Sequence, residues 1–224
     1  MKHPQDAPQT VGLSATALRV LWLVILALFV WLAVLVFRLG LTKNYAIDEF
    51  TYAHASWLIA KGELPYRDFF CHHVPLSYFY YALPFLFLDD NPTNIIWLRV
   101  AALPSVVLLG VCLWAIGARH GRLAAAFAPL FAFSMLPFAA FASEMRPDPM
   151  ALVLSALAVL IAGWRPTVRG VLAGILVAVA VLVSEKVVFY GSVLAVAFVV
   201  DLAYNRRRHG RALLGDPLMF LASA

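Results

Sequence analysis

The chain has 224 residues, of which 63% are apolar and 13% are charged. Soluble domains usually carry about 25% charged residues, so this composition argues against a water-soluble monomer. A bilayer-spanning helix needs roughly 20 mostly apolar residues, and about six such helices would use nearly the whole chain. We therefore expect an all-α integral membrane protein with about six transmembrane helices. The two cysteines, Cys71 and Cys112, lie in neither a zinc nor a redox spacing.

Apolar runs predict the spans in chain order, with short charged segments between them. The predicted spans cover residues 17–39, 95–118, 123–142, 149–164, 168–183 and 187–202. The first run is longer than the core of a signal peptide and no A-x-A site follows it, which predicts a retained span after a cytoplasmic tail, 1–16. Residues 17–204 form one membrane domain. Residues 205–224 form a basic cytoplasmic loop and the start of a further span, so we expect a longer protein.

The loop charges predict how the chain is oriented. One side carries ten cations and three acids, whereas the other carries seven cations and nine acids. The positive-inside rule places the N-terminus and the basic residues 206–211 in the cytoplasm, and the acidic loops outside the cell's inner (plasma) membrane. Contact with anionic membrane lipids explains the basic segment more simply than nucleic acid does, so no nucleic-acid partner is expected.

The first extracytoplasmic loop, about 41–94, is the longest polar segment, and function is expected there. It opens with an interfacial amphipathic helix over 48–61 that Gly62 ends, and its predicted apolar face comprises Phe50, Ala53, Trp57 and Ala60. A turn over 63–68 follows. Residues 74–88 are aromatic and too short for a span, which predicts an interfacial or re-entrant segment.

Three polar clusters carry the candidate chemistry, and each has a plainer interpretation. Asp48 and Glu49 are a general base or ligands for a hard cation, or simply acids stabilised by a helix dipole. In the segment Arg67 to Leu76, one of His72 and His73 is a metal ligand or a hydrogen-bond donor to a phosphate. Both are not expected to act together, because adjacent side chains of an extended stretch point apart. The alternative there is a loop that faces lipid headgroups.

The third cluster, residues 143–149, lies at the outer junction of the third and fourth predicted spans. Arg146 and Glu144 form a charged group at the membrane surface, while Asp148 is either part of the site or a helix cap. Glu185 and Lys186 add a further acid and cation on the same side, or form only a tight exposed turn.

An ordered set of motifs runs through residues 20–200. After the first span come Asp-Glu, Tyr-Ala-His-Ala, Gly-Glu-Leu-Pro-Tyr-Arg-Asp-Phe-Phe, His-His and Pro-Leu-x-Tyr, and later Arg-Pro-Asp-Pro-Met and Ser-Glu-Lys. This order resembles the N-terminal half of the GT-C polyprenyl-phosphate-dependent glycosyltransferases, in the branch of protein O-mannosyltransferases and lipid A aminoarabinose transferases. Arg-Pro-Asp-Pro-Met is similar to the acidic motif at that family's fourth span.

The resemblance implies a glycosyltransferase that moves a sugar, with inversion, from a polyprenyl-phosphate donor to an unidentified acceptor on the extracytoplasmic face. Asp48 matches the first-loop base, Glu49 its neighbour and Asp148 the second acid. These three are the predicted catalytic residues. The predicted donor-phosphate or substrate-binding residues are Arg67, His72, His73, Arg146 and Lys186.

The histidines depart from the family pattern, since His72 and His73 stand where relatives carry Glu and Lys. A divalent cation is the one cofactor considered, with Asp48, Asp148 and His72 as its ligands. Two alternatives stay open: a transporter or flippase for a lipid or small anion, and a truncated, non-catalytic homologue.

Overall fold

The structure is a computed structural model that describes residues 14–162, 167–189, 191–193 and 196. Within these residues the chain is helical and contains no strand, which confirms the all-α fold class. Two segments, α1 (Ala15–Thr42) and Pro92–Ala118, are long and apolar enough to cross a membrane. A bent pair of helices makes a third if it counts as one span, so six spans are not confirmed.

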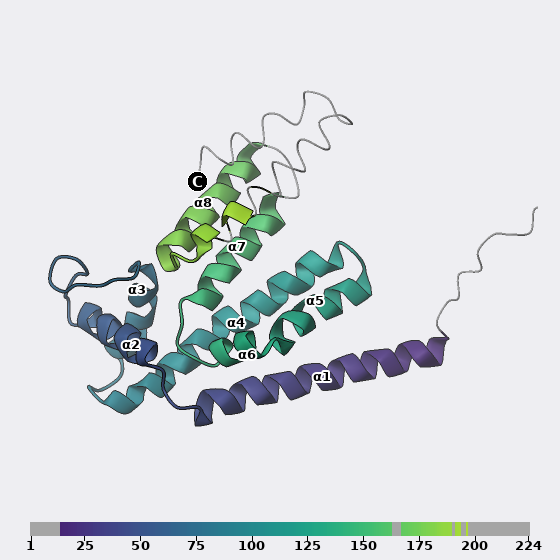
Figure 1. Cartoon of the computed structure of the whole chain (residues 1–224), viewed down its shortest axis with the longest axis horizontal. Coiled ribbons are helices and arrows are strands. Elements are labelled where there is room, and N and C mark those ends of the chain that lie inside the picture. Colours follow the sequence, from purple (N-terminus) through teal and green to yellow (C-terminus); the bar gives the residue numbers. More distant parts are fainter. Residues whose placement is uncertain (1–13, 163–166, 190, 194–195, 197–224) are drawn as a thin grey trace, which may run out of the picture.

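Helix α1 runs along one side of the molecule (Figure 1) and exposes apolar side chains over most of its length. Ser14 caps its first turn by accepting a hydrogen bond from the Ala17 N–H at 3.2 Å. Only Ile25, Leu32 and Val36 are buried on it. A helix that is apolar on nearly all sides suits a lipid environment.

The segment η2 (Pro92–Asn94) leads into α4 (Ile95–Ala118), which packs against most of the other helices. Its main neighbours are α5 (Arg122–Ser134) and α7 (Asp148–Ala162). The turn to α5 depends on two glycines. Gly121 has a φ of +119°, and a Cβ on Gly117 would lie 2.4 Å from the Ala124 carbonyl oxygen.

The third predicted span, 123–142, is broken. It consists of α5 and α6 (Leu136–Ala142), whose axes differ by 80°. Met135 between them has extended backbone (φ −68°, ψ 115°). Pro137 lies in the first turn of α6, where its missing N–H costs no hydrogen bond and its fixed φ favours the start of a new helix.

Helices α7 and α8 (Thr167–Val183) pack against each other and fall where the fourth and fifth spans were predicted. They have 15 and 17 residues, fewer than the roughly 20 that a span needs. Most of the predicted sixth span, 187–202, lies outside the described residues, as do the segment 205–224 and all but the end of the tail 1–16.

The predicted interfacial helix is α2 (Ile47–Ala60), and Gly62, with a φ of +93°, follows its end as expected. The predicted apolar face is wrong in part, because Phe50 is 49% exposed and the buried stripe is Glu49, Tyr52, Ala53 and Ser56. These residues repeat at helical spacing. This side of α2 faces inward because Glu49 pairs with Arg99 of α4.

The rest of the first loop contains the predicted turn and a short aromatic helical segment. Residues 63–68 form a turn in which Tyr66 has a φ of +64° and donates its N–H to the Phe69 carbonyl at 2.9 Å. The aromatic segment is α3 (Leu76–Ala82) continued by η1 (Leu83–Leu86), too short to span a bilayer. A buried cluster joins α2, α3 and α4 and includes Tyr52, Tyr78, Tyr81, Leu98 and Met145. This core positions the loop against the membrane helices.

Candidate functional site

Glu49 lies at the centre of a buried ion pair. Its side chain is fully buried and accepts two hydrogen bonds from Arg99 of α4, at 2.8 Å from Nε and 2.7 Å from Nη2. The N–H groups of Met145 and Ala46 also donate to it, at 3.0 and 2.9 Å. Burial alone would raise the pKa of Glu49, but the hydrogen bonds from Arg99 and the two N–H groups lower it overall. The carboxylate is therefore fully engaged.

Arg99 is itself fixed on every side. It donates from Nη1 to the carbonyls of Gly40 and Lys43 at 2.7 and 3.0 Å, and its guanidinium lies 4.4 Å from the Tyr45 ring centroid. It thus ties the end of α1 and the start of α2 to α4. Glu49 therefore has the surroundings of a structural residue, with no lone pair left to accept a proton from a substrate.

Asp48, the neighbouring acid, is in the opposite situation. Its side chain is 52% exposed, and its recorded ion pair joins Oδ2 to Arg146 Nη2 at 3.4 Å. Arg146 also pairs with the buried Glu144, and Glu144 in turn pairs with Lys43. The Arg146 guanidinium lies 4.4 Å from the Phe141 ring centroid. Asp48 is the loosely held end of this chain of charges.

Asp148 belongs to a second group of contacts at the start of α7. Lys186 Nζ lies 3.1 and 3.2 Å from its two carboxylate oxygens, and the Ser184 hydroxyl donates to it at 3.3 Å. Lys186 is 44% exposed. The structure therefore brings together the predicted acid and the predicted cation, 38 residues apart in the chain.

His73 reaches the same region from the first loop. Its Nδ1 lies 2.8 Å from Glu185 Oε1, and the Tyr66 hydroxyl donates to its carbonyl at 2.6 Å. Burial would raise the pKa of Glu185, but its own backbone N–H and His73 lower it overall. His72 is exposed, and its ring centroid lies 4.0 Å from that of His73. The expectation that the two rings point apart is wrong, because the backbone bends here.

Tyr52 connects the two groups of contacts. It lies one helical turn after Asp48, and its ring is 3% exposed and packs against those of His73 and Tyr78, at centroid distances of 5.5 and 5.8 Å. Burial raises its pKa, and the charges of Asp48, Asp148 and Glu185 raise it further, whereas Arg146 lowers it. Its hydroxyl is therefore within electrostatic reach of all four.

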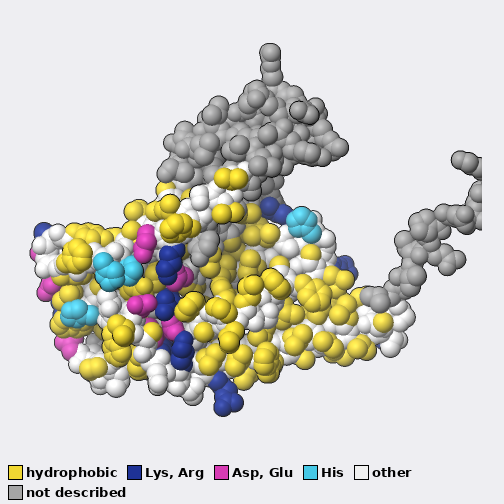
Figure 2. Space-filling view, viewed as in Figure 1, with side chains coloured by type: hydrophobic (Ala, Val, Ile, Leu, Met, Phe, Trp, Pro, Cys, Tyr) yellow, Lys and Arg dark blue, Asp and Glu magenta, His cyan; other side chains and the backbone are white. Residues whose placement is uncertain are grey.

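We call these residues the charged cluster: Lys43, Asp48, Glu144, Arg146, Asp148, Glu185 and Lys186, with Tyr52 and His73. Figure 2 shows acidic and basic side chains gathered in a narrow column on one face, with histidines beside it and apolar side chains around it. Side chains from the first loop, the α6–α7 junction and the end of α8 thus meet in one place. Sequence order alone did not predict these pairings.

Arg67, a predicted phosphate-binding residue, pairs with a neighbour in the first-loop turn. In the described residues it pairs with its neighbour Asp68, at 2.9 Å from Nε and 2.7 Å from Nη2, and it is 66% exposed. Asp68 also caps the turn by accepting the Leu64 N–H at 2.8 Å. The pair fixes the turn and does not contact the charged cluster.

The predicted metal ligands Asp48, Asp148 and His72 contact different partners in the described residues. Among the described residues, no three His, Cys, Asp or Glu side chains are arranged to hold a metal ion. Asp148 already binds Lys186 through both oxygens, and Asp48 pairs with Arg146. Both carboxylates thus face cations in this arrangement, and Asp48, Asp148 and His72 as ligands of a divalent cation stay a prediction.

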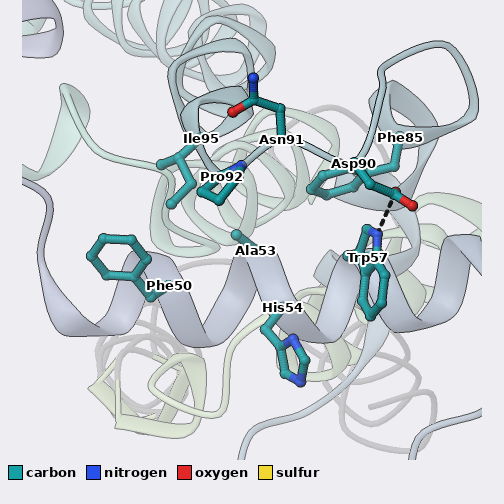
Figure 3. Close-up of a pocket in the computed structure, with 9 residues that line it drawn as sticks. All are labelled: Phe50, Ala53, His54, Trp57, Phe85, Asp90, Asn91, Pro92 and Ile95. Carbon is teal, nitrogen blue, oxygen red and sulfur yellow. Dashed lines mark hydrogen bonds between the residues drawn. The ribbon is translucent and has the colours of Figure 1, made fainter.

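Two cavities lie beside α2 rather than in the charged cluster. The larger, about 430 Å³, is lined by α2 and by the segment before α4 (Figure 3), and in it the Trp57 indole donates to Asp90 at 2.8 Å. The smaller, about 330 Å³, includes His72 and the aromatic residues Phe69 and Phe70. Phe50 and His54 line both. Phe50 is two residues from Asp48, so it lies on nearly the opposite side of α2.

Sequence reasoning missed two members of the charged cluster, Tyr52 and Lys43. Tyr52 was present in the Tyr-Ala-His-Ala motif, four residues after Asp48, and this spacing is a usable signal. Lys43 and Glu144 lie 101 residues apart, and no local pattern could have paired them. Comparison of the chain with family models, curated proteins and solved structures found no match.

Proposed function

We propose that this protein is a membrane glycosyltransferase that takes its sugar from a polyprenyl-phosphate donor. The observation that carries the proposal is the charged cluster, in which the half-exposed carboxylate of Asp48 pairs with Arg146, and Lys186 pairs with the second predicted acid, Asp148. Apolar side chains surround the cluster (Figure 2). The motif order in residues 20–200 supports the same function by resemblance.

The chemistry needs one group to accept a proton and others to stabilise a leaving phosphate. An acceptor hydroxyl attacks the anomeric carbon, the bond from that carbon to the phosphate oxygen breaks, and the lipid phosphate leaves with the electron pair. Asp48 takes the proton of the hydroxyl, as a general base. Attack from the side opposite the phosphate inverts the anomeric carbon.

Arg146 and Lys186 are the groups proposed to hold the phosphate. Both are paired with carboxylates in this structure, so an incoming phosphate must compete for them. The Arg146–Asp48 contact, at 3.4 Å with a half-exposed acid, is longer than the two contacts of Lys186 with Asp148. A phosphate that takes Arg146 would release Asp48 to accept a proton, which couples donor binding to activation of the base.

The location of the cluster also suits a lipid-linked donor. It lies where α2 and α3, helices too short to span, meet the ends of longer apolar helices. A polyprenyl donor stays in the membrane while its phosphate and sugar extend into water, so its reaction must take place at such a boundary. We propose that this boundary is the extracytoplasmic face, as the loop charges predict.

Transport of a lipid or small anion is the second candidate, and one observation favours it. The 80° break between α5 and α6 is the kind of discontinuous helix that transporters use for binding. The break contains Ser134 and Met135 and has no ionisable residue. Flux of a fluorescent polyprenyl phosphate across liposomes, without sugar transfer, would support this candidate instead.

The direct test is a transfer assay with the full chain in liposomes that contain a polyprenyl-phosphate-linked sugar. The proposal predicts formation of free polyprenyl phosphate that depends on an added acceptor. Asp48→Asn should lower the rate by about 10²- to 10⁴-fold, the usual contribution of a general base. Asp89→Asn, an exposed acid of the same loop, is the matched control and should leave the rate unchanged.

Absence of transfer by the wild-type chain with a range of polyprenyl-linked sugars would contradict the proposed function. Equal rates for wild type and Asp48→Asn would remove Asp48 from it.

A further inference from the structure

Tyr52 is a buried side chain whose hydroxyl has no hydrogen-bond partner in the part of the chain that the structure describes. Its ring is 3% exposed within the core that joins α2, α3 and α4. Among the described residues, Ser56 Oγ and the Tyr78 hydroxyl are the enclosed side-chain atoms without a partner, and the Tyr52 hydroxyl is not among them. The hydroxyl therefore reaches the surface of the core, on the side of the charged cluster.

The carboxylates around Tyr52 already have other partners. Asp48 pairs with Arg146, Asp148 with Lys186, and Glu185 with His73. Burial and these negative charges keep the phenol protonated, so it is a hydrogen-bond donor throughout the physiological pH range. An accessible phenol O–H that no protein group engages is available to donate to a ligand.

We infer that the Tyr52 hydroxyl donates a hydrogen bond to the phosphate of the lipid-linked donor, next to Arg146 and Lys186. This inference rests on the proposed function and adds a binding residue to it. An anionic phosphate needs several donors, and the cluster offers two cations and one neutral O–H from three separate segments. The neutral donor adds affinity without the desolvation cost of a third buried charge.

The geometry of α2 makes Tyr52 suited to this role. One turn of helix separates it from Asp48, so both side chains lie on the same face. The rings of Tyr78 and His73 hold the Tyr52 ring from two sides. A phosphate bound by Tyr52 would therefore lie close to the base, with its position fixed by a rigid side chain.

The test compares binding of a long-chain polyprenyl phosphate with binding of the matching polyprenol, which lacks the phosphate. Affinity is measured by native mass spectrometry of the full chain in detergent. Wild type should prefer the phosphate, and Tyr52→Phe should lose about 10- to 100-fold of that preference, the value of a hydrogen bond to a charged group. Its affinity for the polyprenol should stay unchanged.

Tyr78→Phe is the matched control, because it removes a neighbouring phenol hydroxyl that is enclosed in the same core and therefore out of reach of a ligand. It should keep the full preference for the phosphate. A Tyr52→Phe protein that keeps the wild-type preference overturns the role of Tyr52 while leaving the proposed function standing. A wild-type chain without any preference for the phosphate overturns both.

Discussion

Two adjacent acids at the start of α2 occupy contrasting environments. Glu49 is fully buried and accepts hydrogen bonds from Arg99 and from two backbone N–H groups. Asp48 is 52% exposed and has one long ion pair, to Arg146. The backbone of one helical turn therefore presents one carboxylate to the core and the other to the charged cluster.

This contrast shows that two adjacent acids can have different roles, one in stability and one in chemistry. A carboxylate with every lone pair engaged stabilises the fold but has no capacity left to accept a proton. A carboxylate held by a single exchangeable partner contributes little to stability and is free for chemistry. The rigid Glu49–Arg99 pair fixes the position from which Asp48 acts.

The largest effect is expected from breaking the buried pair. Arg99→Met would leave Glu49 buried without its partner and should lower the free energy of unfolding by about 3–5 kcal/mol. The measurement is thermal or denaturant unfolding of the purified chain in detergent. Arg67→Met, which removes a 66% exposed arginine paired with Asp68, is the control and should leave the free energy of unfolding close to that of the wild type. Equal losses for the two variants would show that the Glu49–Arg99 pair is not a special constraint.

A large effect on donor recognition is expected from Lys186→Met. Loss of a charged contact to phosphate should raise the KM for the polyprenyl-phosphate sugar by about 10- to 100-fold. Lys61→Met is the control, because Lys61 pairs with Asp90 outside the charged cluster. Steady-state kinetics at varied donor concentration measure both. An unchanged donor KM in Lys186→Met would exclude this lysine from phosphate binding.

The dependence of stability on pH should report on Glu49. The pKa of folded Glu49 lies below its ordinary value of 4.5, so its stabilising contribution is present above that pH and is lost as the pH falls through the folded pKa. Unfolding temperatures should therefore decline below about pH 4.5, and Glu49→Gln should flatten this decline. Glu63→Gln serves as the control. An identical acid profile in wild type and Glu49→Gln would refute the linkage.

The smallest effect is expected at the outer edge of the cluster. Glu185 is 46% exposed and pairs with His73, so Glu185→Gln should change the free energy of unfolding by less than about 1 kcal/mol. The same denaturant titration measures it. A loss as large as that of Arg99→Met would mean that the His73–Glu185 contact, not the Glu49–Arg99 pair, anchors the first loop.

The sequence predicted the elements better than their contacts. Helix α2 was predicted within one residue at each end, since the acids of its first turn and Gly62 mark its limits. The break after Ser134 was missed although Pro137 was a visible signal. The buried side of α2 was misjudged because a pattern of apolar residues cannot show that Glu49 is buried. Its partner, Arg99, is distant in the sequence.

The candidate site was predictable as a set of segments and not as a set of pairs. Asp48, Arg146, Asp148 and Lys186 were all chosen from the sequence, and the structure brings them into one cluster. Their partners come from residues up to about 100 positions away, such as Lys43 with Glu144. Only the fold determines which charges meet, so the different environments of Glu49 and Asp48 were not visible in the sequence.

The most direct test of the account compares Asp48→Asn with Glu49→Gln, each assayed for sugar transfer per folded molecule and for unfolding temperature. The account predicts that Asp48→Asn keeps the wild-type unfolding temperature and loses transfer. Glu49→Gln should unfold at a lower temperature, while its folded fraction still transfers sugar. Full transfer by folded Asp48→Asn, or loss of transfer without loss of stability in Glu49→Gln, would contradict the division of roles between the two acids.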